Sequence, residues 1–143
     1  MDAAEPDRLP DWTPGTVAIL STGGGAPHAI PVSTGVRAGP RTILFALARR
    51  RESLARLRAE PRCALTLLDA GVALTAHARA IVVQDPMPIS DRLVAVRLDV
   101  ERIQDHGRPD FRIDGGVPWH WTDADAERRD AELRAALAEL AMS

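Results

Sequence analysis

The chain has 143 residues, 45% of them hydrophobic and 27% charged, which fits a single globular domain with one hydrophobic core. Its formal net charge of −2 indicates no general attraction to nucleic acids or anionic membranes, so we expect neither as a partner. All 18 basic residues are arginine, which excludes lysine Schiff-base chemistry and a Walker A phosphate loop. The single cysteine, Cys63, excludes an internal disulfide and a zinc site built from several thiolates.

The N-terminal segment 1–14 is acidic and rich in proline, and we predict a flexible tail preceding one domain over residues 15–143. Trp12 is the one residue of this tail expected to attach it to the domain. No apolar run reaches the length of a membrane span, and no basic segment followed by an apolar core marks a secretion signal. We therefore expect a cytoplasmic protein.

Strand patterns dominate the first third of the chain. Residues 16–22 form a short apolar run that ends at a glycine-rich turn, and residues 28–37 alternate between two faces. A second turn precedes the apolar run 41–48. The spacing predicts a meander of three antiparallel strands.

A helical pattern replaces the strands at residues 50–60, where Leu54 and Leu57 share a face and Pro61 ends the helix. Strand character returns at residues 62–69 and again at 71–85.

The last part of the chain begins with residues 91–105, of which Leu93–Val96 fits either a helix or a strand and the remainder alternates as a strand. Residues 106–121 form an irregular connection. A closing helix is predicted over 122–141, with Thr122 as its N-cap. Its apolar stripe consists of Ala126, Leu133, Ala136, Leu137 and Leu140. About six strands joined mostly by tight turns predict a mainly β fold, a small antiparallel barrel capped by helices.

Three consecutive arginines, Arg49, Arg50 and Arg51, lie between the strand 41–48 and the helix that follows. The first N–H groups of a helix have no internal acceptors, and arginine offers paired donors that suit a phosphate. The alternative is a solvated cluster at the start of an exposed helix. Because positive charge at this end opposes the helix dipole, the pattern favours phosphate binding.

The order of these elements resembles the pyridoxamine-phosphate-oxidase-like flavin-binding split β-barrels, which include F420-dependent reductases. Three segments carry the resemblance: "TVAILSTGGGAPHAIPVSTGV", "TILFALARRRESLARLRAEPRCALTLLD" and "ARAIVVQDP". It extends from about Thr16 to Trp121. The resemblance implies a six-stranded, Greek-key-like antiparallel split β-barrel with a short helix between strands 3 and 4 and a C-terminal helix.

The resemblance further implies a homodimer that holds FMN, or alternatively F420, in grooves at the subunit interface. The flavin ring would contact Pro31, Val32, Ser33, Leu47 and Ala48. The phosphate would contact Arg49, Arg50, Arg51, Ser53 and Arg56. Trp119 or Trp121 would come from the partner subunit.

The sequence departs from this family at the helix that would receive the phosphate. Many FMN-binding members carry a lysine in its first turn and an asparagine one turn later, where this chain has Ser53 and Arg56. This difference affects which residues would contact the phosphate and which of the two cofactors, FMN or F420, would bind.

The histidines and the cysteine give no separate catalytic motif. His28 is interpreted as a surface residue, with contact to a substrate as the alternative, and His77 as a packing or interface residue. The four histidines lack metal-binding spacing, so no metal site is expected. We expect Cys63 to be a buried, unreactive thiol. Trp119 and Trp121 are interpreted as structural residues that cover an interface, with stacking on a flat ligand as the alternative for at least one of them.

Together these patterns predict an FMN-dependent oxidoreductase acting on a small organic substrate, with no catalytic residue identified because the cofactor carries the redox chemistry. The alternatives are an F420-dependent reductase, a non-catalytic flavin- or haem-binding protein, and a barrel that has lost its cofactor site.

Overall fold

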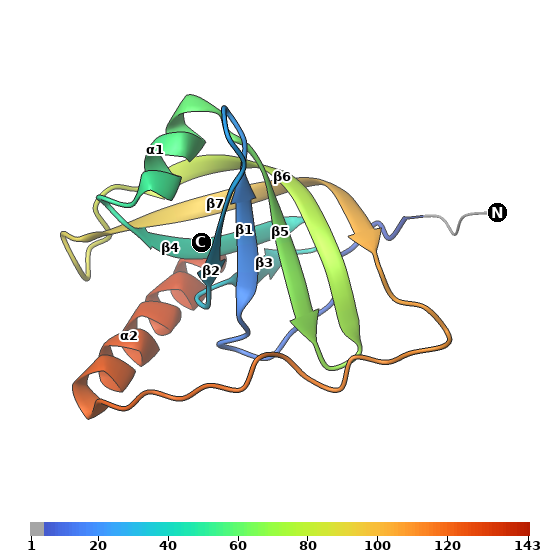
Figure 1. The fold of residues 1–143 in the computed structure, drawn as a ribbon. Coiled ribbons are helices and arrows are strands. Elements are labelled where there is room, and N and C mark those ends of the chain that lie inside the picture. The colour runs from blue at the N-terminus through green and yellow to red at the C-terminus, as the bar shows by residue number, and fades with distance from the viewer. Residues whose placement is uncertain (1–4) are drawn as a thin grey trace.

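The computed structural model describes residues 5–143. Within that range the chain forms seven strands and two helices (Figure 1). In chain order they are β1 (Ala18–Thr22), β2 (His28–Val32), β3 (Val36–Gly39), β4 (Thr42–Ala48), α1 (Glu52–Ala59), β5 (Arg62–Asp69), β6 (Val72–Gln84), β7 (Leu93–Asp105) and α2 (Ala124–Ala141).

All seven strands belong to one antiparallel sheet in the order β2-β1-β5-β6-β7-β4-β3. The sheet curves around its core, but β2 and β3 lie at opposite edges, so it does not close. The mainly β, antiparallel prediction is confirmed. The count of six strands and the opening three-stranded meander are wrong.

The error arises at residues 33–35, which interrupt the strand predicted over 28–37. The backbone N–H of Ala46 donates to Thr34 Oγ1 at 3.0 Å, so a side chain takes the acceptor position of a strand carbonyl there. The chain before this break pairs with β1, and the chain after it pairs with β4. One predicted strand is therefore two, and α1 follows the fourth strand instead of the third.

Leu93–Val96, whose sequence fits either a helix or a strand, forms the start of β7. This strand is 13 residues long and pairs with β4 on one side and β6 on the other. Pairing on both sides satisfies its backbone N–H and C=O groups, which explains why it is extended.

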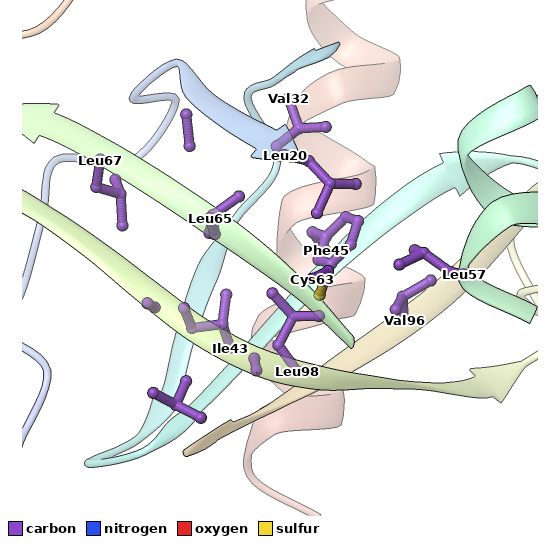
Figure 2. Close-up of a cluster of buried hydrophobic side chains, with 14 of the residues drawn as sticks. Leu20, Val32, Ile43, Phe45, Leu57, Cys63, Leu65, Leu67, Val96 and Leu98 are labelled. Carbon is purple, nitrogen blue, oxygen red and sulfur yellow. The ribbon is translucent and has the colours of Figure 1, made fainter. Parts of the chain in front are cut away.

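The core lies between the two halves of the curved sheet, and Figure 2 shows the side chains that fill it. Phe45 and Leu20 are completely buried there, and Leu65 and Leu98 meet them from other strands. Leu57 of α1 closes one end.

The closing helix α2 packs on the other face of β4. Leu133 and Leu137 are buried against Leu44 and Ala46, which confirms the predicted apolar stripe as the docked face. The N-cap is Asp123, whose carboxylate accepts from the N–H of Ala126 at 3.0 Å, so the assignment of Thr122 is wrong by one residue. Neither this helix nor α1 has the length and apolar character that crossing a lipid bilayer requires.

The N-terminal segment is attached to the sheet at several points. Leu9 is buried in the core, and Trp12 Nε1 donates to the carbonyl of Gly35 at 3.0 Å, the attachment expected of this residue. The N–H of Thr13 donates to Oδ2 of Asp69 at 2.7 Å. This bond, together with one from the backbone of Ala70, lowers the pKa of Asp69 below its usual value.

The pH dependence of stability should reveal this carboxylate. A lowered pKa in the folded state means that Asp69 stabilises the fold above its unfolded-state pKa of about 3.9, and that this stabilisation is lost as the pH falls toward the folded-state pKa. Melting temperatures measured between pH 7 and pH 3 should therefore decline less steeply for Asp69→Asn than for the wild type. Parallel declines would contradict this role.

The thiol of Cys63 lies at the start of β5 within the core. Burial raises its pKa to about 12. Because the thiolate is the reactive form, this cysteine is unreactive near neutral pH, and the prediction of a buried residue is confirmed.

Candidate functional site

A long groove lies where the end of β4 meets the loop 85–92 and the first half of α2. Its larger hollow, of about 930 Å³, is lined by Ser33, Thr34, Ala46, Trp121 and residues of the loop and of α2. Its smaller hollow, of about 730 Å³, is lined by Ala48, Arg49, Arg50, Asp91 and Arg92. Asp91 and Arg92 line both, so the two hollows adjoin. We call the combined feature the arginine groove.

The wall of the arginine groove comes from alternate residues of β4. Successive side chains of a strand point to opposite faces, so Ala46 and Ala48 face outward to the groove while Leu47 points into the core. Val32, the last residue of β2, is also buried in the core (Figure 2).

The residues predicted to contact a flavin ring are thus divided. Ser33 and Ala48 line the groove. Val32 and Leu47 lie behind it with their side chains in the core, and Pro31 is exposed on the outer face of the sheet. Thr34 and Ala46 also line the groove. They are joined by the hydrogen bond described above, at the break between β2 and β3.

Arg49 anchors the loop 85–92 to the end of β4. Its backbone N–H donates to the carbonyl of Arg92 at 2.9 Å, and its Nε lies 3.0 Å from Oδ1 of Asp85. Arg58 of α1 reaches the other oxygen of Asp85 at 2.6 Å. Arg49 is therefore partly neutralised within the chain.

The next two arginines are free of such partners. The side chains of Arg50 and Arg51 are exposed and make no hydrogen bond or ion pair with any residue of the described chain. Arg50 lines the groove, whereas Arg51 lines neither hollow and forms the N-cap of α1 with extended backbone. The predicted cluster of three arginines has three different environments.

Ser53 and Arg56, the other two residues predicted to bind phosphate, are engaged inside the chain. Ser53 is 1% exposed, and its Oγ lies 3.2 Å from Nε2 of His28. The Nδ1 of His28 lies 3.1 Å from Oε2 of Glu52, which also accepts from Nε of Arg56 at 2.9 Å. A second nitrogen of Arg56 donates to the carbonyl of Ala26 at 2.7 Å.

This network, the His28 cluster, joins the glycine turn before β2 to the first turn of α1. It uses the side chains of His28, Glu52, Ser53 and Arg56. None of them lines the arginine groove. His28 is three-quarters buried at its side chain and connects two elements, in contrast to the surface residue that the sequence predicted.

The two tryptophans contact each other edge to face, with ring centroids 5.3 Å apart. Trp119 Nε1 donates to the carbonyl of Gly15 at 2.9 Å, and Trp121 Nε1 donates to Oδ2 of the buried Asp130 at 3.3 Å. Trp121 lines the groove of its own chain, whereas Trp119 does not.

Three arginines of the groove were not predicted from the sequence. Arg92 directly precedes β7, and Arg128 and Arg129 lie on α2. Each lies in an ordinary sequence context, and only the pairing of β4 with β7 and the docking of α2 bring them to Arg50 and Ser33. No local signal in the sequence reports this proximity.

No protein-family model matches the chain, and no curated protein sequence matches it. Solved structures do. An F420 reductase superposes with a TM-score of 0.55 at 14% identity, covering 63% of this chain and 90% of the other. A Listeria innocua protein named as a candidate pyridoxamine 5'-phosphate oxidase gives a TM-score of 0.54 at 16% identity, covering 64% and 88%. Flavin reductase PheA2 gives 0.53 at 12% identity, covering 76% and 91%.

The chain has their split β-barrel fold. The resemblance stated from the sequence is thereby confirmed at the level of fold. At these identities the split barrel establishes the architecture, and the chemistry has to be argued from the arginine groove itself.

Proposed function

We propose that the arginine groove binds FMN and that the protein is a flavin-dependent oxidoreductase. One observation carries the proposal: an arginine-rich hollow adjoins a larger hollow whose β4 side is uncharged and whose α2 side carries charges of both signs. A flavin mononucleotide has the matching composition, with a flat ring system at one end and a phosphate at the other.

In this arrangement the ring would lie in the larger hollow, against Ala46 and Ser33, with the indole of Trp121 at its border. The phosphate would lie in the smaller hollow, where Arg49 and Arg50 supply charge-assisted hydrogen bonds. When bound, the flavin supplies hydride transfer, and the protein supplies binding, orientation and the polar groups that tune the ring. The names of the neighbouring structures, which include flavin and F420 reductases, support the same assignment.

A deazaflavin, F420, is the second candidate. Its ring would occupy the same wall, and its longer acidic tail would also suit arginines. The larger hollow extends past Arg92 to α2, where Arg129 has no ion pair with any described residue and would meet such a tail, although Asp130 and Glu132 line the same hollow. A non-catalytic flavin or haem carrier is the third candidate.

Ligand binding tests the proposal directly. The visible spectrum of the purified protein should show flavin absorption, or titration of the colourless protein with FMN should quench flavin fluorescence at micromolar concentration or below. Parallel titrations with F420 and haem separate the candidates. Reoxidation of the bound, reduced cofactor by small organic substrates distinguishes an enzyme from a carrier, and failure to bind any of the three ligands would refute the proposal.

A homodimer is part of the proposal. Neither helix lies over the middle of β1 and β5 (Figure 1). The outer face of β2, β1 and β5 carries mainly small and apolar side chains, whereas the same face of β6 carries Thr75, His77 and Arg79. Ile19 is 40% and Leu68 45% exposed there, an apolar surface that favours association. The other members of this face are Ser21, Ala29, Pro31, Ala64 and Thr66.

A charge at the centre of this face should prevent dimerisation. Ile19 lies between Pro31 and Thr66 on the neighbouring strands, so Ile19→Arg would place an unpaired cation in an apolar contact. Light scattering should give the mass of two chains for the wild type and of one for the variant. Arg8→Ala, on a different part of the surface, should remain dimeric.

A further inference from the structure

Arg92 has a fixed position beside the end of β4. The ladder between β4 and β7 ends with the pair Ala48 and Leu93, and the next residues continue it through the bond from the Arg49 N–H to the Arg92 carbonyl. On the other side, the N–H of Arg92 donates to Oγ of Ser90 at 3.2 Å. The backbone of Arg92 is thus held from both directions although it belongs to a loop.

The side chain of Arg92 is exposed and lines both hollows of the arginine groove. Within residues 5–143 it makes no hydrogen bond or ion pair, and the same holds for Arg50 in the smaller hollow. Asp91 is the single carboxylate lining that hollow, and Asp85 is already shared by Arg49 and Arg58. Two unpaired guanidinium groups therefore border one hollow with a net positive charge.

The first turn of α1 is a poorer binding site for an anion than the smaller hollow. Glu52 already supplies a carboxylate there, held by His28 and Arg56, and Ser53 is buried against His28. A phosphate at this position would have to displace the Glu52 side chain and would be repelled by its negative charge.

We infer that Arg92 and Arg50 together form the clamp for the terminal phosphate of the cofactor, and that Ser53 and Arg56 take no direct part. This inference rests on the proposed function, because it assigns the anionic end of the same groove. It places the phosphate between two segments that are distant in the sequence, the end of β4 and the start of β7.

Comparison of FMN with riboflavin tests the clamp, since the two differ only in the phosphate. The dissociation constants of both are measured by fluorescence for the wild type, Arg50→Ala, Arg92→Ala, Ser53→Ala and Arg112→Ala. Arg112 is exposed in the connection after β7, has no ion pair with any described residue, and provides the same change in net charge. Circular dichroism and melting temperature verify that each variant is folded.

The wild type should bind FMN more tightly than riboflavin, and Arg92→Ala and Arg50→Ala should each reduce that preference by about tenfold or more, as expected for a lost hydrogen bond to a charged group. Ser53→Ala and Arg112→Ala should retain it. If FMN binds but Arg92→Ala keeps the full preference, or Ser53→Ala loses as much, the clamp is refuted while the proposed function stands. If the wild type binds neither flavin nor F420, both are refuted.

Discussion

Replacing Phe45 by alanine is expected to lower the free energy of unfolding by about 3–5 kcal/mol, the cost typical of removing a buried phenylalanine. Phe45 is completely buried at the centre of the core, where side chains from β1, β5 and β7 surround it (Figure 2). A loss of this size is a large part of the stability of a single domain. Urea unfolding followed by circular dichroism measures it.

The chain provides a matched control, because it contains only two phenylalanines. Phe111 lies in the connection after β7 and is 45% exposed. Phe111→Ala should change the free energy of unfolding by less than about 1 kcal/mol, in the range of surface substitutions. Equal losses in the two variants would mean that the core does not depend on Phe45.

The second large effect concerns ligand affinity. Replacing Arg49, Arg50 and Arg51 together by alanine should weaken FMN binding at least about 100-fold, because hydrogen bonds to a charged group contribute roughly 1.5–3 kcal/mol each. Riboflavin, which lacks the phosphate, should bind nearly as well as to the wild type. Fluorescence titration at constant ionic strength measures both, since salt weakens the attraction of exposed charges.

A second triple variant separates local contacts from the general effect of charge. Arg8, Arg108 and Arg112 are exposed and lie outside the arginine groove, so their joint replacement removes the same three charges elsewhere. It should leave the FMN affinity within a fewfold of the wild type. If both triple variants lose equally, the arginines act through net charge and the phosphate contacts proposed here are wrong.

Most of the fold follows from local patterns, and its errors have a common physical origin. The alternation of β5 and the spacing of Leu54 and Leu57 in α1 predict the elements that the structure contains. The break at residues 33–35 depends on a hydrogen bond between Thr34 and Ala46, which no window of the sequence around Thr34 contains. Strand breaks set by distant partners are beyond a local pattern.

The site shows the same division. The position of Arg50 after a strand and before a helix predicts a place in the site, and this residue does line the groove. The absence of the Leu47 side chain from the groove could have been anticipated, since Leu47 alternates with Ala46 and Ala48 along β4. The presence of Arg92 in the groove could not, because it depends on the register between β4 and β7. Nor could the His28 cluster, which joins a turn to a helix through four side chains.

The pairing of β4 with β7 also determines when the groove can form. Its two halves are separated by α1, β5 and β6, so the groove is absent until strands far apart in the chain have paired. Sheets dominated by such non-local pairs fold slowly, commonly in milliseconds to seconds. A ligand that needs both halves binds the folded state alone and stabilises it by mass action. Flavin fluorescence during refolding would therefore report the last stage of assembly, and apoprotein would be the form most exposed to unfolding.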